Sequence, residues 1–360
     1  MSTGDRATPI LPGRLGNPDM ALADDPRADP RMIAALATVG LGGPAEPSPV
    51  TGASPLDELH TYVDEAEQGF GGLFDVLMEG LEPVAGVERS VEIVSGVDGN
   101  DITLYVHRPA HTDGPVPAVL HIHGGGMVLL EAAGLSYQRW RDELAATGMV
   151  VVGVEFRNGG GKHGRHPFPA GLNDCTTALQ WLHDHRGDFG ISKIVVSGES
   201  GGGNLTLATT LKAKRDGRLG QIDGVYAQCP YISGAYADPP ATLPSLTEND
   251  GYFIACDQMG ALAKVYDPDG ENATNPLAWP LNAGTDDLAG LPPHVVSVNQ
   301  LDPLRDEGLA YYRKLVDAGV SAYSRTVNGT CHAGDCIYRT AMPEVYSATI
   351  RDIKGFADSL

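Results

Sequence analysis

The sequence predicts an α/β fold in which a mostly parallel, doubly wound sheet carries helices on both faces. From residue 87 onward, apolar strand-like runs alternate with segments of helical periodicity, and such alternation specifies a parallel sheet. The inner runs are almost continuously apolar, as strands that are covered on both faces require. With 360 residues, of which 42% are apolar and 20% charged, the chain is long enough to bury a core of this kind.

The first part of the chain differs in character from the rest. Residues 1–28 are rich in Pro, Gly, Asp and Ala without any period, so we expect an extended arm there. A helix is expected over 29–40, because Asp29 can cap it and a proline follows at the first helical position. Apolar residues recur at helical spacing over 54–82. Residues 1–82 are therefore predicted to form an N-terminal arm and cap helices.

Residues 83–360 are predicted to form the main domain. Its first two strands, 90–95 and 102–107, are separated by an Asp-Gly-Asn turn, which favours an antiparallel hairpin at the sheet edge. Six further strands are expected at 118–123, 149–156, 193–198, 223–229, 294–300 and 321–327. Helices are expected over 135–146, 171–185, 202–215, 304–318 and 343–358. The alternation breaks over about 231–270, where only 257–266 looks helical, and this predicts an insertion at one end of the sheet.

Composition narrows the classes of partner. Against 25 Lys and Arg stand 46 Asp and Glu, a formal net charge of -21, which disfavours nucleic acid and anionic membrane surfaces. Five scattered cysteines do not form a disulfide framework. The start of the chain lacks a secretory pattern, and no apolar run reaches the roughly 18–20 residues that span a bilayer. We expect a soluble, cytoplasmic protein; assembly into a homo-oligomer is left open.

One glycine-rich turn follows the expected strand 193–198. The segment GESGG at 198–202 fits the pattern G-x-S-x-G, with Ser200 between a strand and a helix. Glycines two positions either side let the serine occupy a very sharp turn, because a side chain there would collide with neighbouring backbone. The start of the following helix directs N–H groups toward the serine. A glycine-rich turn without chemistry is the alternative, but this context favours Ser200 as a nucleophile.

A second glycine-rich segment, HGGG at 123–126, follows the strand 118–123. Together with the N–H of Gly201, its backbone N–H groups could stabilise an oxyanion. A phosphate loop is the alternative, but Lys and Ser or Thr would then follow the glycines, whereas the apolar run 127–130 follows here. We interpret His123 as an anchor of this loop rather than as a base.

A serine nucleophile needs a histidine base that a carboxylate orients. Asp302 and His332 follow the strands 294–300 and 321–327, in the order serine, acid, histidine. Both therefore fall at the carboxyl edge of the sheet, where open α/β sheets bind ligands. Among the rivals, Asp306 and Glu307 should already lie inside a helix, and His294 precedes its strand and should lie at the opposite edge.

Cysteines flank the candidate base and raise the alternative of a metal site. The spacing C-H-x-x-x-C over 331–336 lacks the paired ligands that zinc sites usually show. We therefore interpret Cys331 and Cys336 as small buried thiols. A cysteine nucleophile is a further alternative, but no cysteine lies on a turn like that of Ser200. No metal and no organic cofactor is expected for the reaction.

Several ordered motifs together resemble the hormone-sensitive lipase family of α/β-hydrolases, in its bacterial esterase branch. They are HGGGM, GESGGGN, LPPHVVSVNQLDPLRDEG and GTCHAGD, and the resemblance covers about residues 85–358. It implies an α/β-hydrolase fold with an eight-stranded sheet and a helical cap. That cap would consist of the N-terminal helices and the insertion after the sixth strand.

The resemblance also implies carboxylic ester hydrolysis and assigns the site. It makes Ser200, Asp302 and His332 the catalytic triad, and Gly125, Gly126 and Gly201 the oxyanion donors. Two departures from the family concern the pocket wall. Glu199 and Gly201 stand where the family usually has aspartate and alanine, and the stretch 155–169 lacks the usual tyrosine-arginine-leucine-alanine-proline-glutamate run.

The small-molecule substrate is less defined than the reaction. The resemblance implies either a macrocyclic lactone or, by default, a short-chain or aryl ester, with the cap restricting its size. One alternative is a ligand receptor on a hydrolase scaffold; plant receptors that resemble the family lack the histidine, whereas His332 is present here. An amidase or peptidase that uses the same triad is another alternative.

Overall fold

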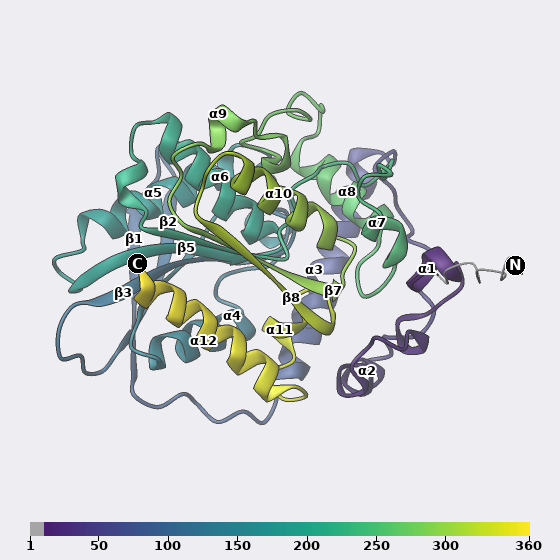
Figure 1. Ribbon diagram of the computed structural model, residues 1–360, viewed down its shortest axis with the longest axis horizontal. Coiled ribbons are helices and arrows are strands. Elements are labelled where there is room, and N and C mark those ends of the chain that lie inside the picture. The colour runs from purple at the N-terminus through teal and green to yellow at the C-terminus, as the bar shows by residue number, and fades with distance from the viewer. Residues whose placement is uncertain (1–10) are drawn as a thin grey trace, which may run out of the picture.

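The computed structural model describes residues 11–360 and contains one eight-stranded sheet (Figure 1). Its strands are β1 (Val87–Ser95), β2 (Asp101–Pro109), β3 (Val116–Ile122), β4 (Val150–Glu155), β5 (Ile191–Glu199), β6 (Gly224–Gln228), β7 (His294–Leu301) and β8 (Ala322–Cys331). They lie in the order β1-β2-β4-β3-β5-β6-β7-β8. β2 pairs antiparallel with β1 and with β4, and every other pair in the sheet is parallel. The predicted α/β fold with an antiparallel hairpin at its edge is therefore confirmed.

Helices cover both faces of the sheet. Figure 1 shows α5 (Ala170–Asp184), α6 (Gly201–Arg215) and α10 (Arg305–Asp317) on one face, and α4 (Leu135–Ala146) and α12 (Pro343–Ser359) on the other. The two layers of apolar side chains between sheet and helices form separate buried clusters. Because β3 to β6 are buried on both sides, their apolar runs are nearly continuous. Each of these helices was predicted to within a residue or two.

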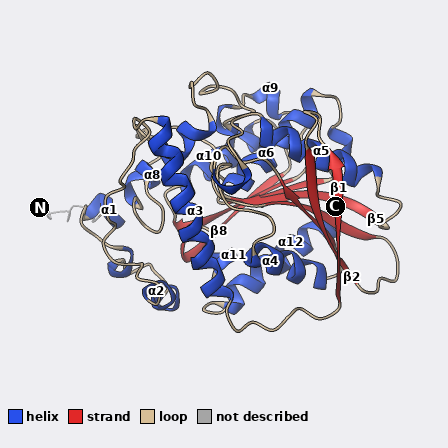
Figure 2. Cartoon of the chain, turned by 180° about the vertical axis from the view of Figure 1, so that it is seen from behind, coloured by secondary structure: helices blue, strands red, loops and turns tan. Residues whose placement is uncertain are grey.

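The N-terminal helices lie beside one end of this sheet. α2 (Pro30–Ala37) begins as predicted, and its cap residue Asp29 accepts a hydrogen bond from the Arg31 N–H. The periodic segment after it forms one long helix, α3 (Leu56–Met78). Figure 2 shows α3 running across the end of the sheet beside α8 (Cys256–Tyr266), and the two helices are in contact.

The segment expected as an extended arm contains two helical turns, α1 (Gly13–Gly16) and the 3-10 helix η1 (Leu22–Asp24). Side-chain contacts hold this segment on the main domain, because Arg27 pairs with both Asp25 and Glu248. Residues 1–10 of the predicted arm lie outside the described part of the chain. The division into units 1–82 and 83–360 stays a prediction.

Short helices fill the connections after β6 and elsewhere. They are η2 (Gly161–His163), η3 (Leu219–Gln221), α7 (Ser245–Glu248), η4 (Pro280–Asn282), α9 (Thr285–Leu288) and α11 (Gly334–Ile337). α7 and α8 lie within the predicted insertion 231–270. No helix within residues 11–360 is both long and apolar enough to cross a bilayer.

Candidate active site

Ser200 occupies the turn between β5 and α6, in a backbone conformation that side chains rarely adopt. Its φ is 58° and its ψ is -120°. The flanking glycines allow the turn: a Cβ on Gly198 would lie 2.3 Å from the carbonyl oxygen of Ile122, and one on Gly202 only 2.0 Å from it. Two contacts this short would push the turn away from β3. The strained turn thus places Ser200 at the start of α6, above the edge of the sheet.

The glycine loop after β3 comes directly against the start of α6. Gly125 has a φ of +99°, and a Cβ on it would lie 2.0 Å from the carbonyl oxygen of Leu129. A Cβ on Gly201 would lie 2.6 Å from the backbone nitrogen of Gly126. The structure therefore brings together the three glycines that the sequence suggests as oxyanion donors.

The residues that depart from the family pattern make hydrogen bonds to the glycine loop. The Glu199 carboxylate accepts a hydrogen bond of 2.6 Å from the Gly124 N–H. In the stretch 155–169, the N–H groups of Gly159 and Gly160 donate to carbonyl oxygens of the loop segment 127–128, at 2.9 and 3.0 Å. The unusual residues of this chain therefore hold the glycine loop in place.

Asp302 and His332 follow β7 and β8 and form a buried pair. His332 Nδ1 lies 2.9 Å from Asp302 Oδ2. The second carboxylate oxygen accepts the Leu304 N–H at 2.9 Å, and Asn249 donates to the Asp302 carbonyl at 3.1 Å, so the acid is fixed on two sides. Burial opposes the charged imidazolium, but the Asp302 carboxylate and the neighbouring Cys229 sulfur together outweigh it and hold the pKa of His332 well above its ordinary value.

Ser200, His332 and the glycine loop line one small cavity of about 90 Å³. Its remaining wall is mostly apolar and comes largely from α3, α8 and the loops beside them: Phe70, Phe74, Leu129, Leu130, Tyr137, Tyr231, Phe253, Ile254, Met259, Leu262, Leu304 and Ile337. A larger cavity of about 650 Å³ lies next to it, since both are lined by Phe74, Leu130 and Tyr137. A small apolar chamber thus adjoins a wider space.

The side chains considered as alternatives for the acid and the base make contacts away from the cavity. Asp306 accepts the Ser245 N–H at 2.8 Å, and Glu307 accepts the Ile232 N–H at 2.7 Å, both from the first turn of α10. His294 begins β7, and its Nδ1 lies 2.7 Å from the Pro292 carbonyl oxygen. None of these three side chains lines the cavity that contains Ser200.

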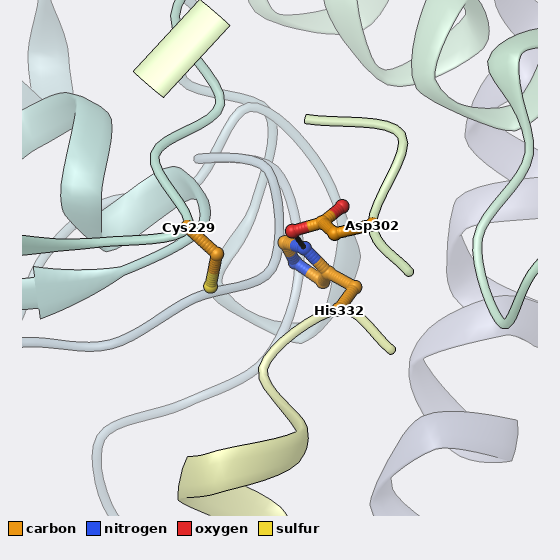
Figure 3. Close-up of side chains that lie close together, drawn as sticks. All are labelled: Cys229, Asp302 and His332. Carbon is orange, nitrogen blue, oxygen red and sulfur yellow. Dashed lines mark hydrogen bonds and ion pairs between the residues drawn. The ribbon is translucent and has the colours of Figure 1, made fainter. Parts of the chain in front are cut away.

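Sequence reasoning missed Cys229, which directly follows β6. Figure 3 shows its side chain beside the His332 ring and the Asp302 carboxylate, and one potential ligand atom from each residue lies within 4.8 Å of the others. Burial raises the pKa of the Cys229 thiol, which keeps it protonated. The signal was available, because Cys229 ends a parallel strand at the same edge as Asp302 and His332.

Cys331 and Cys336 show no metal-ligand arrangement. Cys331 Sγ lies 3.7 Å from the Tyr338 hydroxyl, and Cys336 Sγ accepts a hydrogen bond of 2.9 Å from Gln228. Both thiols are free. Within residues 11–360, neither belongs to a group of three side chains that could hold an ion, so the structure gives the metal interpretation of 331–336 no support.

Comparison with known proteins decides the family. Residues 119–334 match the family model described as alpha/beta hydrolase fold. The chain belongs to the α/β-hydrolase family. This α/β-hydrolase is 48% identical to a solved brefeldin A esterase, described as a bacterial homologue of human hormone-sensitive lipase. That match has a TM-score of 0.93 and covers 97% of this chain and 98% of the other.

Other relatives of this α/β-hydrolase are also esterases. The carboxylesterase NlhH of Mycobacterium tuberculosis is 34% identical over 76% of this chain and 83% of its own length. The arylesterase of Saccharolobus solfataricus is 35% identical over 60% of this chain and 67% of its own length. The structure of esterase Est22 matches with a TM-score of 0.82 and 37% identity, over 94% of this chain and 99% of the other. This α/β-hydrolase is a serine carboxylesterase, and the receptor alternative is not favoured.

Proposed function

We propose that Ser200, His332 and Asp302 form the catalytic triad and hydrolyse carboxylic esters through an acyl-enzyme. The observation that carries this proposal is the 2.9 Å contact between His332 and Asp302, beside the cavity that Ser200, His332 and the glycine loop share. Three separate segments of the chain supply these groups at one edge of the sheet. Convergence of this kind supports the assignment of a triad, which is judged by geometry and role.

In the first half of the reaction, Ser200 Oγ attacks the ester carbonyl while His332 takes its proton. The carbonyl π electrons move onto the oxygen, where the N–H groups of Gly125, Gly126 and Gly201 stabilise the negative charge. The intermediate then collapses, the bond to the alcohol oxygen breaks, and His332 returns the proton to that leaving group. Ser200 is left carrying the acyl group as an ester.

In the second half, water attacks the acyl-enzyme as His332 removes one of its protons. Collapse of the second tetrahedral intermediate breaks the bond to Ser200 Oγ, which receives the proton back, and releases the carboxylic acid. Asp302 accepts the hydrogen bond from His332 Nδ1 throughout and stabilises the imidazolium. None of these steps needs a metal or an organic cofactor.

The two adjoining cavities suggest where each part of an ester substrate binds. The chamber of about 90 Å³ beside Ser200 suits a short acyl group, and its apolar wall would exclude charged acyl chains. The neighbouring cavity of about 650 Å³ suits a larger alcohol part, such as an aryl group. A macrocyclic lactone carries its acyl and alcohol parts in one ring, which would have to extend from the wide cavity to Ser200. The solved brefeldin A esterase that resembles this chain supports testing a lactone of that class first.

The test uses Ser200→Ala with a chromogenic short-chain ester and a covalent phosphonate probe. We expect turnover to fall by about 10⁴-fold or more, and the phosphonate to label Ser200 alone in the unmodified enzyme. Ser192→Ala serves as the matched control, because Ser192 lies near the start of β5, at the far end of that strand from Ser200, and lines neither cavity. Near-normal turnover of Ser200→Ala, or a label on another residue, would rule the assignment out. Profiling amides beside esters separates an amidase from an esterase.

A further inference from the structure

Outside the triad, two glutamates and a histidine come together behind the glycine loop. Glu131 ends this loop, Glu155 ends β4, and His163 lies in η2. His163 Nε2 lies 3.5 Å from Glu131 Oε2 and 3.7 Å from Glu155 Oε1. One potential ligand atom from each of the three residues lies within 4.8 Å of the other two. Three distant segments therefore aim metal-binding atoms at one point.

A second nitrogen, from the fully buried His123, faces Glu155 in this group. Its Nε2 lies 3.8 Å from Glu155 Oε1 and has no hydrogen-bond partner within residues 11–360. His123 Nδ1 lies 2.8 Å from the Gly124 carbonyl oxygen, to which it can only donate. The Nε2 of this neutral ring therefore carries a lone pair, pointed toward an oxygen that also carries lone pairs. A cation between the two would turn this repulsion into attraction.

The surrounding contacts hold these atoms in place for a ligand. His163 Nε2 is also buried without a hydrogen-bond partner in the described part of the chain. The two Glu155 oxygens accept the N–H groups of Ala132 and Ala133 at 2.8 and 3.1 Å, which orients the carboxylate and leaves a lone pair on each oxygen.

We propose that Glu131, Glu155 and His163 bind a divalent transition-metal ion, for which Zn²⁺ has the right chemistry, with the unpartnered Nε2 of His123 facing Glu155 from the side of the glycine loop. Zinc takes imidazole and carboxylate ligands at 2.0–2.2 Å, which puts neighbouring donors of a tetrahedral site roughly 3.3–3.5 Å apart. His163 Nε2 lies 3.5 Å from Glu131 Oε2, within this range, and 3.7 Å from Glu155 Oε1, which exceeds it by a few tenths of an ångström. Two carboxylates and one imidazole balance a charge of +2 and leave the fourth position to water.

One contact has to change when the ion binds. Lys162 Nζ lies 2.5 Å from Glu131 Oε2 and occupies the oxygen that would face the metal. The Lys162 side chain is 61% exposed, so it can turn into water at little cost. Glu131 and Lys162 both line the wide cavity of about 650 Å³, which gives the ion a path to the site.

The ion would tie the Glu131 end of the loop 123–131 to β4 and η2. Gly125 and Gly126 lie in the same loop, so the site is structural support for the loop and takes no part in the hydrolytic steps. Binding should therefore raise the melting temperature, while the metal-free enzyme keeps its triad and hydrolyses esters.

The experiment titrates metal-stripped, full-length protein with Zn²⁺ by calorimetry and follows thermal melting in parallel. The unmodified protein should bind one ion at this site and melt at a higher temperature with it. His163→Gln and Glu131→Gln should each weaken that binding at least about tenfold and lose the increase in melting temperature. His111→Gln is the matched control, because His111 is exposed and distant in sequence, and it should bind as the unmodified protein does.

The cluster of Cys229, Asp302 and His332 could also attract Zn²⁺, so the same titration is made with Cys229→Ser. Retention of the site in Cys229→Ser, together with its loss in His163→Gln, supports the proposal. The proposal is overturned if no ion binds, if His163→Gln and Glu131→Gln bind Zn²⁺ as tightly as the unmodified protein, or if only Cys229→Ser abolishes binding. Metal-free melting temperatures of the variants show whether each one folds.

Discussion

His332 Nδ1 and Asp302 Oδ2 lie 2.9 Å apart, and the Asp302 side chain has no exposed surface. Because the carboxylate can only accept, His332 must carry its proton on Nδ1 when the ring is neutral. That leaves Nε2 with the lone pair that a base needs. In the proposed mechanism, the same contact stabilises the imidazolium once a proton has been taken from Ser200.

Asp302→Asn should remove this control of the tautomer. We expect kcat to fall about 10³–10⁴-fold with little change in KM, because substrate binding does not use the carboxylate. Asp306→Asn is the control, since Asp306 caps a neighbouring segment without lining the cavity. Steady-state kinetics on one chromogenic ester compare the two variants; a loss of less than tenfold in Asp302→Asn would contradict the assignment.

The raised pKa of His332 predicts how activity depends on pH. Only the neutral ring accepts the Ser200 proton, so kcat/KM should rise with pH as His332 loses its own proton. The midpoint of this rise should lie above 6.5, the ordinary value for histidine, because Asp302 stabilises the charged form. A profile measured from pH 5 to 9 tests this, and the midpoint should move lower in Asp302→Asn. A midpoint at or below 6.5 would show that Asp302 does not act on His332 in this way.

Gly125→Ala should displace the oxyanion donors without unfolding the protein. Its φ of +99° disfavours alanine, and the new Cβ would lie 2.0 Å from the Leu129 carbonyl oxygen, so the loop has to shift. We expect kcat to fall about 10²–10³-fold, the usual cost of losing one donor. Gly114→Ala is the control, since nothing lies within 4 Å of a Cβ there. Unchanged turnover in Gly125→Ala would place the oxyanion elsewhere.

The buried carboxyl group of Glu307 should make the free energy of unfolding depend on pH. Burial raises its pKa from 4.5 to about 7, and its Oε2 has no hydrogen-bond partner within residues 11–360. The folded state binds the Glu307 proton more tightly than the unfolded state does. The protonated carboxyl group therefore contributes its full amount to the free energy of unfolding below pH 4.5, and this contribution is lost as pH rises to about 7. The total loss is roughly 3 kcal/mol.

Glu307→Gln should escape this loss, because the amide oxygen can still accept from the Ile232 N–H and the Tyr236 hydroxyl. Urea unfolding at pH 5 and pH 8 measures the difference. The variant should gain stability relative to the unmodified protein as the pH rises, and a constant difference would contradict the raised pKa. Asp306→Asn, measured in the same way, controls for a general effect of removing a carboxylate.

Much of the fold follows from local pattern, and the structure confirms it. The predicted strands and helices agree with the observed elements because sheet and helix periods differ clearly in the buried part of the chain. Agreement is poorer before residue 29, where α1 and η1 replace an expected extended arm. Nothing periodic marks that segment, and the ion pair that holds it, between Arg27 and Glu248, joins residues 221 positions apart.

The residues of the site also fall into two groups, those that the sequence could predict and those that it could not. The order of Ser200, Asp302 and His332 and their places after strands could be predicted, because every parallel strand delivers its carboxyl end to one edge. Cys229 obeys the same rule but carries no motif, and Glu307 is polar in a helix that looks amphipathic. Glu131, Glu155 and His163 have no shared spacing at all. Their meeting depends on how the glycine loop packs against η2.

The sequence by itself determined the strand-to-helix turn at Ser200 and the order of the groups along the sheet edge. Glycines at 198 and 202 mark this turn in the sequence, although the atom that a Cβ would meet first at either position is the Ile122 carbonyl oxygen of β3. Only the tertiary structure decided which side chains face the cavity, that the Asp302 carboxylate reaches His332, and that α3 and α8 narrow the chamber. Those outcomes depend on packing between segments distant in the chain, where a shift of an ångström changes which atoms can touch.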